Sequence, residues 1–307
     1  MEHIYDILIV GGGPGGYTAA LYGARAGLDT ALVEKLSAGG QMALTEQIDN
    51  YPGFPEGIDG FTLGENMKKQ AERFGAESVY GEVIRAELSG AVKKVYTADG
   101  VLSARSVIVA AGAVPKKLGL PGEEALTGRG VGYCATCDGM FYRGKDVAVA
   151  GGGETAVADA LFLSRICRRV YVIHRRDSLR ASKASQEALF QMENVEMIWD
   201  STVAELHSKD GRLSGLSIYN KKTGGTSELS CQGLFVAIGQ APASGPFAGE
   251  LSTDEGGYLK AGEDTKTNLP GVFAVGDIRT KAVRQVVTAV ADGASAVHYA
   301  EEYLNGK

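Results

Sequence analysis

Residues 7–35 read ILIVGGGPGGYTAALYGARAGLDTALVEK, and this stretch decides the fold. An apolar run, a glycine-rich turn, an Ala-rich segment and a second apolar run ending at Glu34 predict strand, turn, helix and strand. Gly11, Gly13 and Gly16 have the G-x-G-x-x-G spacing. The first glycine permits a tight turn, the second lets the backbone approach a pyrophosphate, and the third lets helix and strand pack closely. The stretch therefore predicts a βαβ unit that binds a dinucleotide.

Two further features of this unit suit a dinucleotide. The predicted helix starts near Pro14, and free N–H groups at a helix N-terminus bind phosphates. Glu34 ends the second strand, where a carboxylate accepts hydrogen bonds from the hydroxyls of an adenosine ribose. Lys35 follows it directly. We include Pro14, Glu34 and Lys35 among the candidate cofactor-binding residues.

The same pattern returns 140 positions later, in VAVAGGGETAVADALFLSRICRRVYVIHRR, residues 147–176. Gly151, Gly153 and Ala156 take the three motif positions, and His174 stands where the first unit has Glu34. Arginines follow His174 at 175, 176 and 180. A carboxylate would repel a ribose 2′-phosphate, whereas guanidinium groups bind it through charge-assisted hydrogen bonds. A solvated charged face is the alternative explanation. The two units together fit FAD in the first and NADPH in the second.

The order of segments predicts an α/β protein with two Rossmann-like dinucleotide-binding domains of the three-layer ββα type. After the second unit the chain becomes β-rich, with a strand pair around the turn at residues 209–211, and then returns to a flavin-type ending. We therefore expect residues 118–244 to form an NADPH domain inserted into an FAD domain made of residues 1–117 and 245–307. Gly- and Pro-bearing linkers flank the insertion.

Other segments rich in glycine and small residues are candidates for contacting the cofactors, although each is also compatible with an ordinary loop. In the FAD domain the candidates are Gly40, Gln41, Asn50, Gly112, Gly276 and Asp277, with Gly112 expected to end one strand. In the NADPH domain they are Gly152, Gly153, Glu154, Thr155, His174, Arg175, Arg176, Arg180, Ile238 and Gly239, with Gly239 expected to end another strand.

The stretch GYCATCDGMF contains Cys134 and Cys137, followed at once by Asp138. A structural zinc site needs about four ligands, but Cys167 and Cys231 are isolated in the chain and the four histidines are scattered. A permanent disulfide across so short a loop would add little stability. A redox pair is the favoured interpretation, and we predict no metal site.

Composition points to a cytoplasmic protein. The chain has 307 residues and a formal net charge of −6, which gives no electrostatic reason to expect nucleic acid or an anionic membrane as partner. The first apolar run is too short for a secretory signal or a membrane span. Four cysteines are too few for a disulfide scaffold, so a disulfide here would be catalytic.

The motifs GGGPGG, GGQM with IDNYPGF, CATCDG, GGGETA, HRRDSLR, AIGQAP and GVFAVGD with RQ occur in this order. Together, over essentially the whole chain, they resemble the low-molecular-weight thioredoxin reductases. The resemblance implies FAD and NADPH as cofactors, thioredoxin as the protein substrate and a homodimer. It also implies a redox-active disulfide in the NADPH domain, and rotation of that domain relative to the FAD domain during turnover.

The resemblance also implies residue roles. Cys137 would be the thiol next to the flavin, Cys134 the thiol that attacks the substrate disulfide, and Asp138 the general acid and base. An aspartate at a helix start or turn before Gly139 is the alternative for Asp138. Arg284 and Gln285 match the family's flavin-contacting RQ pair, and a simple helix N-terminus is their alternative.

One position departs from the family. Glu154 stands where members often have Asn or Asp, so we expect its carboxylate close to the pyrophosphate. We also expect the substitution Glu154→Asn to leave the KM for NADPH unchanged or lower it.

A ferredoxin-dependent reductase, a dithiol oxidase and a nucleotide-binding redox sensor without turnover are competing functions.

Overall fold

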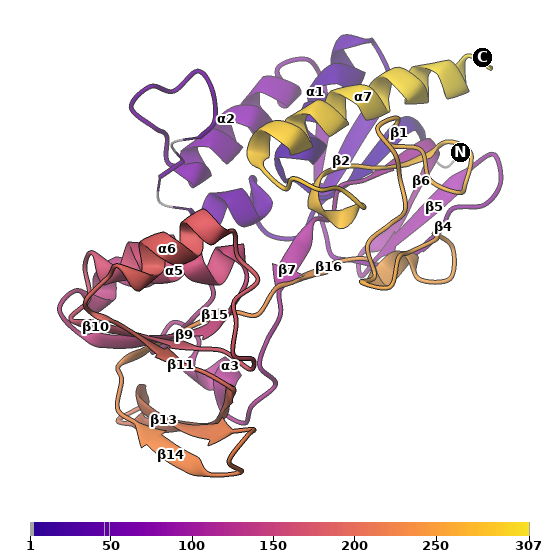
Figure 1. The fold of residues 1–307 in the computed structure, drawn as a ribbon. Helices are drawn as coiled ribbons and strands as arrows, with labels where there is room; N and C mark the ends of the chain where they lie inside the picture. Colours follow the sequence, from indigo (N-terminus) through magenta and orange to yellow (C-terminus); the bar gives the residue numbers. More distant parts are fainter. Residues whose placement is uncertain (1–2, 46, 49, 307) are drawn as a thin grey trace. The chain divides into compact units, whose positions relative to one another are not determined.

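The computed structural model describes residues 3–45, 47–48 and 50–306, apart from the side chains of Leu44 and Cys137 (Figure 1). The chain divides into two compact units: unit 1 comprises Met1–Val114 and Ala241–Lys307, and unit 2 comprises Pro115–Gln240. The expected boundaries, after residues 117 and 244, lie slightly too far along the chain. The reason is that the crossings are not loops: they form strands β7 (Ala113–Pro115) and β16 (Gln240–Pro242), which pair with each other.

Unit 1 is built on a sheet with strand order β3-β2-β1-β6-β5-β4, in which β17 also pairs with β6. Its parallel strands are β1 (Ile4–Val10), β2 (Thr30–Glu34), β3 (Glu77–Tyr80), β6 (Gly100–Val109) and β17 (Val272–Ala274). The antiparallel strands are β4 (Val83–Glu87) and β5 (Lys93–Thr97). The helices are α1 (Pro14–Arg25), α2 (Gly60–Glu72) and α7 (Val286–Leu304), with short 3-10 turns η1 (Gly40–Leu44), η3 (Gly245–Phe247) and η4 (Gly276–Ile278).

Apolar side chains cover both faces of this sheet. Ile7 and Ile9 of β1 pack with α1 and α7 on one face, and Leu8 and Val10 pack on the other with Phe247. This alternation follows from the period of two in a strand, and it explains why the strand sequence ILIV is apolar throughout.

The register of the parallel strands aligns their carboxyl ends. Val10 of β1 lies beside Val33 of β2 and Val109 of β6, and Val109 lies beside Ala274 of β17. The segments that follow these four strands therefore leave the sheet at one edge, which is where ligands bind in open α/β sheets.

Unit 2 has three layers. A parallel sheet with order β11-β10-β9-β15-β8 lies between helices on one face and an antiparallel sheet, β12-β13-β14, on the other. The parallel strands are β8 (Val131–Gly132), β9 (Asp146–Gly151), β10 (Arg169–Ile173), β11 (Val195–Ile198) and β15 (Gly233–Ala237). The antiparallel strands are β12 (Ser201–Lys209), β13 (Arg212–Asn220) and β14 (Thr226–Leu229). The helices are α3 (Glu123–Leu126), α4 (Ala135–Asp138), α5 (Glu154–Ser164) and α6 (Lys183–Phe190), with 3-10 turn η2 (Gly139–Tyr142).

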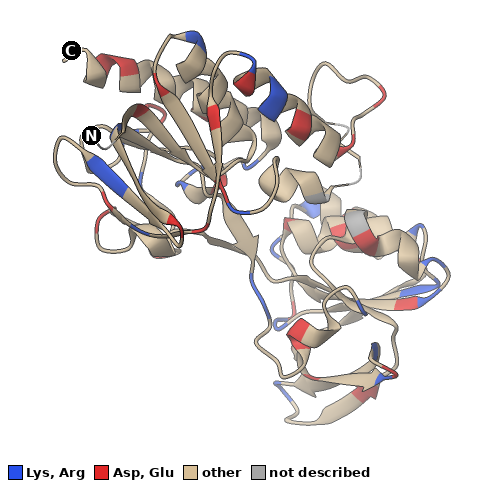
Figure 2. Ribbon diagram, turned by 180° about the vertical axis from the view of Figure 1, so that it is seen from behind, with Lys and Arg blue, Asp and Glu red and all other residues tan. Residues whose placement is uncertain are grey.

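These layers agree with the predicted fold class. The hairpin expected around residues 209–211 is present, with both Asp210 and Gly211 in the left-handed region at φ 52° and 71°. Acidic and basic residues are interspersed along the ribbon of both units (Figure 2). Across the described ranges, no helix is long and apolar enough to cross a lipid bilayer.

Candidate active site and cofactor sites

The glycine turn of unit 1 has the geometry that its spacing predicts. Gly11 has φ +108°, and a Cβ atom on Gly16 would lie 1.9 Å from the Gly11 carbonyl oxygen, so only glycine fits there. Gly13, the N-cap of α1, faces open space with no atom within 4 Å of its would-be Cβ. No side chain caps the helix, which begins at Pro14. The first N–H groups of α1 are therefore available to a ligand.

The carboxylate of Glu34 lies beside this turn. Its Oε2 accepts a hydrogen bond from the Gly12 N–H at 2.5 Å, and its Oε1 accepts from the Lys35 N–H at 2.6 Å. The ammonium group of Lys35 lies elsewhere, in an exposed ion pair with Glu82 at 2.7 Å. The structure thus brings Glu34 to the glycine turn but not the Lys35 side chain.

The loop after β2 joins the same edge. Gly39 N–H donates to the Gly12 carbonyl at 2.8 Å, a Cβ on Gly40 would lie 3.4 Å from Gly13 Cα, and Gln41 is exposed. Gly40 and the glycine turn are therefore neighbours.

Two candidates that lie far apart in the sequence are in direct contact. Asn50 Nδ2 donates to Gln285 Oε1 at 2.9 Å. Gln285 is also the N-cap of α7 and forms a capping box with Thr288, so the helix N-terminus considered as an alternative is present. Capping α7 and contacting a flavin are compatible roles, because the capping residue Gln285 also contacts the loop that carries Asn50.

The ends of β6 and β17 contribute the remaining candidates of unit 1. Gly112 does not end β6 as expected, because β6 ends at Val109. Gly112 is a left-handed residue, at φ +69°, in the connection between β6 and β7. Gly276 is left-handed at φ +71° and starts η4, followed by Asp277. Burial raises the pKa of the Asp277 carboxyl, while the nearby charges of Lys281 and Arg284 oppose the rise.

Arg284 has a buried guanidinium nitrogen, Nε, without a hydrogen-bond partner among the described residues. Its guanidinium carbon lies 4.1 Å from the centroid of the Tyr258 ring, and its Nη2 donates to the Arg279 carbonyl at 3.4 Å. A buried, unpaired donor is costly and suggests that a ligand completes its hydrogen bonding.

Unit 2 repeats the arrangement at the atomic level. A Cβ on Gly152 would lie 2.2 Å from Nδ1 of His174, just as a Cβ on Gly12 would lie 2.6 Å from Oε2 of Glu34. Gly153, like Gly13, faces open space. In both units, therefore, the side chain at the end of the second strand, or directly after it, lies against the middle one of three consecutive glycines.

The buried imidazole of His174 packs against the glycine turn of unit 2 and is not part of the exposed cluster of arginines that follows it. It is 5% exposed, and its Nε2 is the other buried side-chain atom that lacks a hydrogen-bond partner within the described part of the chain. Burial lowers the pKa of its imidazole, and the neighbouring arginines 180, 175 and 176 lower it further. The ring is therefore neutral at pH 7.

The three arginines are exposed and carry the positive charge of this site. Among residues whose positions the structure describes, none forms an ion pair with Arg175, Arg176 or Arg180. The Arg180 N–H donates to the Gly152 carbonyl at 2.7 Å, which ties the HRRDSLR segment to the glycine turn. Guanidinium groups in this position suit an anionic ligand.

Glu154, whose carboxylate we expect close to the nucleotide diphosphate, has hydrogen-bond partners within the protein. It is the first residue of α5, and its carboxylate accepts hydrogen bonds from the Ser182 N–H at 2.8 Å and from the hydroxyl of Ser185. These hydrogen bonds, the Ser185 one foremost, lower the pKa of Glu154. The carboxylate is thus engaged with the N-terminus of α6, while its neighbour Thr155 is exposed.

The remaining nucleotide candidates follow β15, which ends at Ala237 rather than at Gly239. Ala237 lies beside Gly151 in the register, so Ile238 and Gly239 leave the sheet at the edge of the glycine turn. Ile238 is exposed, and Gly239 is left-handed at φ +118°.

The cysteine motif follows β8 in the same unit. Cys134 is disulfide-bonded and half-buried, and its Sγ lies 3.4 Å from the Thr136 hydroxyl. The side chain of Cys137 lies outside the described residues. Cys167 and Cys231 are free and buried, and burial raises their pKa values to about 11 and about 12. Of the cysteines whose side chains the structure describes, Cys134 is thus the one in a disulfide.

Asp138 ends α4, next to the end of β8. A Cβ on Gly132 would lie 3.2 Å from Asp138 Oδ2. Its side chain does not cap η2, and it accepts no hydrogen bond from the described residues, so the turn role is not observed. Burial raises the pKa of its carboxyl. It is suited to hold a proton at higher pH than an exposed aspartate.

Three residues near this motif were missed in the sequence. Met140 and Phe141 follow it and are 46% and 74% exposed. Asp159 lies in α5, the helix that packs on α4, and burial raises its pKa to about 7. The sequence feature that could have identified Asp159 is its position as a carboxylate within the apolar segment AVADALFL. No three His, Cys, Asp or Glu side chains within the described ranges are grouped to hold a metal ion.

The sequence and structure match known proteins over nearly their whole lengths. Residues 5–293 match the pyridine nucleotide-disulphide oxidoreductase family. Thioredoxin reductase of Streptomyces coelicolor is 48% identical, covering 99% of this chain and 95% of that protein, and the Bacillus subtilis protein is 45% identical over 98% and 96%. The thioredoxin reductase structure from Lactococcus lactis has a TM-score of 0.87 at 42% identity, covering 99% and 100%. The chain belongs to the pyridine nucleotide-disulphide oxidoreductase family and, within it, to the thioredoxin reductases.

Proposed function

We propose that this protein is an NADPH-dependent thioredoxin-disulfide reductase with FAD as its flavin. One observation carries the proposal: a disulfide at Cys134, the residue before α4, is followed at the end of that helix by Asp138, a partly buried carboxyl without a hydrogen-bond partner in the described chain. A reductase needs such a sulfur pair with an acid beside it. The names of the relatives support thioredoxin as the substrate.

Unit 1 fits FAD. The open turn at Gly13 and the uncapped start of α1 suit a diphosphate, and the Glu34 carboxylate suits the adenosine ribose. Gly40, Gln41, Asn50, Gly112, Gly276, Asp277, Arg284 and Gln285 are proposed as the further contacts. The unpaired Nε of Arg284 is the described buried donor of unit 1 that a flavin would satisfy.

Unit 2 fits NADPH. Arg175, Arg176 and Arg180 would bind the 2′-phosphate, and the N-terminus of α5 at Gly153 and Thr155 would bind the diphosphate. The neutral His174 offers an unpaired Nε2. Gly152, Ile238 and Gly239 would line the rest of the site, with Glu154 supporting it through α6.

When bound, NADPH supplies a hydride and FAD relays its two electrons to the disulfide. The Cys134–Cys137 disulfide takes up these two electrons and becomes a dithiol. Cys134, as a thiolate, attacks a sulfur of the thioredoxin disulfide, forming a mixed disulfide and releasing one thioredoxin thiolate. Cys137 then attacks Cys134 sulfur, which re-forms the internal disulfide and frees reduced thioredoxin. Asp138 gives its proton to the flavin-side thiolate of Cys137 and later takes one back.

Met140 and Phe141 support a protein substrate. Large apolar side chains exposed beside a reactive disulfide are typical of surfaces that bind another protein. We assign these two side chains to thioredoxin docking.

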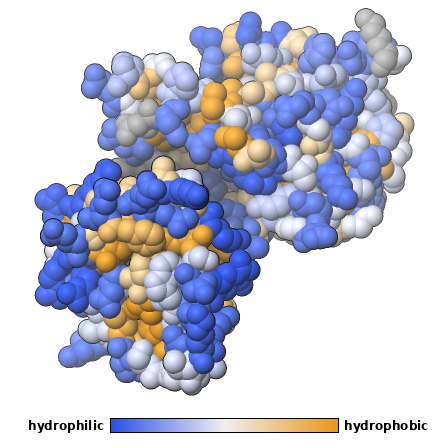
Figure 3. Space-filling model, in the orientation of Figure 1, coloured by the Kyte–Doolittle hydropathy of each residue, from blue (hydrophilic) through white to orange (hydrophobic). Residues whose placement is uncertain are grey.

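The proposal includes a homodimer in the cytoplasm. Unit 1 exposes Tyr22, Phe61, Val283 and Val287, and hydrophobic areas are present among the hydrophilic surface in Figure 3, as a self-association surface requires. Buried free thiols at Cys167 and Cys231 agree with a reducing compartment. Size-exclusion chromatography with light scattering measures the oligomeric state.

The decisive experiment is NADPH oxidation by the FAD-loaded protein with thioredoxin from the same source. We expect rapid oxidation that requires both thioredoxin and Cys134, and its loss in Cys134→Ser. Flavin reduction by NADPH without any effect of thioredoxin would point to another disulfide partner or to a dithiol oxidase. A flavin that stays oxidised with NADPH but is reduced by ferredoxin would overturn the assignment of the electron donor.

A further inference from the structure

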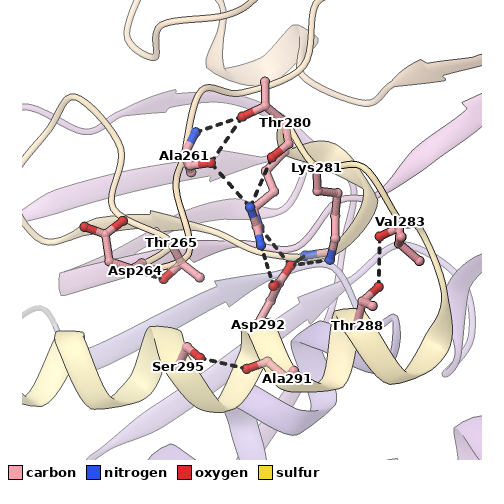
Figure 4. A network of polar contacts seen from close by, with 12 residues as sticks. Ala261, Asp264, Thr265, Thr280, Lys281, Val283, Thr288, Ala291, Asp292 and Ser295 are labelled. Carbon is pink, nitrogen blue, oxygen red and sulfur yellow. Dashed lines mark hydrogen bonds and ion pairs between the residues drawn. The ribbon is translucent and has the colours of Figure 1, made fainter.

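A buried cluster of charged side chains contacts the backbone just after β17, at Gly276. Asp292 of α7 accepts hydrogen bonds from Arg279 Nε at 2.9 Å and Nη2 at 2.7 Å, from Lys281 Nζ at 2.8 Å and from the Gly276 N–H at 2.8 Å (Figure 4). The side chains of Arg279, Lys281 and Asp292 are 3%, 7% and 8% exposed. Four donors thus converge on one carboxylate inside unit 1.

This cluster is not balanced in charge. It holds two cations and one anion, and the hydrogen bonds from Arg279 and Lys281 lower the pKa of Asp292, which keeps it ionised. Burying ions costs several kcal/mol each unless partners compensate. Among these three residues cations outnumber the anion, and the charge of Lys281 also acts on the neighbouring carboxyl of Asp277.

The cluster also connects the elements that form the candidate flavin site. Gly276 and Asp277 start η4 at the carboxyl edge of the sheet. On α7, Gly293 follows Asp292, and a Cβ there would lie 2.3 Å from the Gly15 carbonyl in α1. Asp292 thereby ties η4 to the junction of α1 and α7.

The connection extends to Arg284. Arg279 donates to the Ala261 and Thr280 carbonyls at 3.3 and 3.1 Å, and its own carbonyl accepts from Arg284 Nη2 at 3.4 Å. The segment between η4 and α7 is thus held at its start by the contact of Arg279 with Asp292. Nearer α7 it is held by the contact of Arg284 with the Arg279 carbonyl.

We propose that Asp292, with Arg279 and Lys281, is a positioning network for the dinucleotide diphosphate and flavin contacts of unit 1. It fixes Gly276, Asp277 and Arg284 at the strand edge before the cofactor arrives. None of the three is a catalytic residue. The inference rests on the proposed function, because it assigns FAD to unit 1.

The test is the affinity of the apoprotein for FAD, measured by quenching of flavin fluorescence. We expect Asp292→Asn to weaken FAD binding by about tenfold, which corresponds to about 1.4 kcal/mol, because Arg279, Lys281 and the Gly276 N–H would lose their shared carboxylate acceptor and no longer fix the flavin contacts. Lys281→Met leaves the two Arg279 hydrogen bonds to Asp292 in place, so it should fold and bind FAD several-fold less tightly.

The matched control is Tyr303→Phe, near the other end of α7. It removes a 3.0 Å hydrogen bond from the fully buried ammonium group of Lys93, so it should lower stability but leave FAD affinity unchanged. Unchanged FAD affinity in Asp292→Asn and Lys281→Met, with NADPH-driven thioredoxin reduction intact, would overturn the network while sparing the proposed function. A native protein that binds no FAD would overturn both.

Discussion

The Ser182 backbone N–H donates to the Glu154 carboxylate at 2.8 Å, joining the first turns of α5 and α6. The sequence suggested that this carboxylate faces the nucleotide diphosphate and opposes binding. In the structure it accepts hydrogen bonds from the start of α6 instead, directly after the segment that carries Arg180. Its effect on the nucleotide is therefore indirect.

The substitution Glu154→Ala tests this correction. It removes the acceptor for Ser182 and Ser185, so stability should fall slightly, and the KM for NADPH should rise about two- to threefold as the Arg180 segment loosens, with kcat unchanged. Steady-state kinetics and urea unfolding measure both effects. A fall in KM would restore the original interpretation, in which the carboxylate repels the nucleotide.

The arginine site predicts a preference between nucleotides. Arg176→Gln removes a charged donor without removing packing, because the side chain is exposed. The KM for NADPH should rise about tenfold while that for NADH stays constant, as expected for one charged hydrogen bond to a phosphate. Arg165→Gln, an exposed arginine at the end of α5, is the matched control. Equal losses with both nucleotides would argue against recognition of the 2′-phosphate.

Asp138→Asn separates the two half-reactions. Loss of a proton donor beside the cysteines should slow thiol transfer by about 100-fold, whereas flavin reduction by NADPH should keep its rate. Stopped-flow absorbance follows the flavin, and a thioredoxin-coupled assay follows thiol transfer. If both steps slow equally, Asp138 is a structural residue.

Asp159 predicts a pH-dependent stability. Its folded-state pKa of about 7 lies above the value of 3.8 for a free side chain, so its contribution to stability is complete below pH 4 and is lost as pH rises to 7. Asp159→Asn, neutral at every pH, should therefore exceed the native protein in stability by about 2 kcal/mol above pH 7. The difference should vanish near pH 4.

Urea unfolding at several pH values measures this difference, with Asp99→Asn, in an exposed turn, as control. A difference that does not change with pH would show that burial does not perturb Asp159.

The local features of both sites could be predicted from sequence, and the reason is physical. The glycine spacing sets backbone contacts within about twenty residues, so Gly11 and Gly16 have the expected geometry. Because the motif recurs 140 positions later, the same prediction applies to unit 2, where Gly152 and His174 repeat the contact of Gly12 and Glu34. Strand ends were less accurate, since Gly112 and Gly239 lie beyond the strands that they were expected to end.

Contacts between distant segments could not be predicted. The hydrogen bond of Asn50 to Gln285 and the ion pair of Arg279 with Asp292 depend on how β17, α7 and the loop after β2 fold together. A composition or spacing rule does not contain that information. The partner of Glu154 was missed for the same reason, because Ser185 belongs to a helix that starts 29 residues later.

The burial of Cys167 and Cys231 has a practical consequence. With pKa values of about 11 and about 12, both remain protonated and shielded at neutral pH. An alkylating reagent added to the native protein after mild reduction will therefore label the CATC motif with little background. A fluorophore or affinity tag can be placed beside the reacting sulfur without first removing any cysteine by mutagenesis.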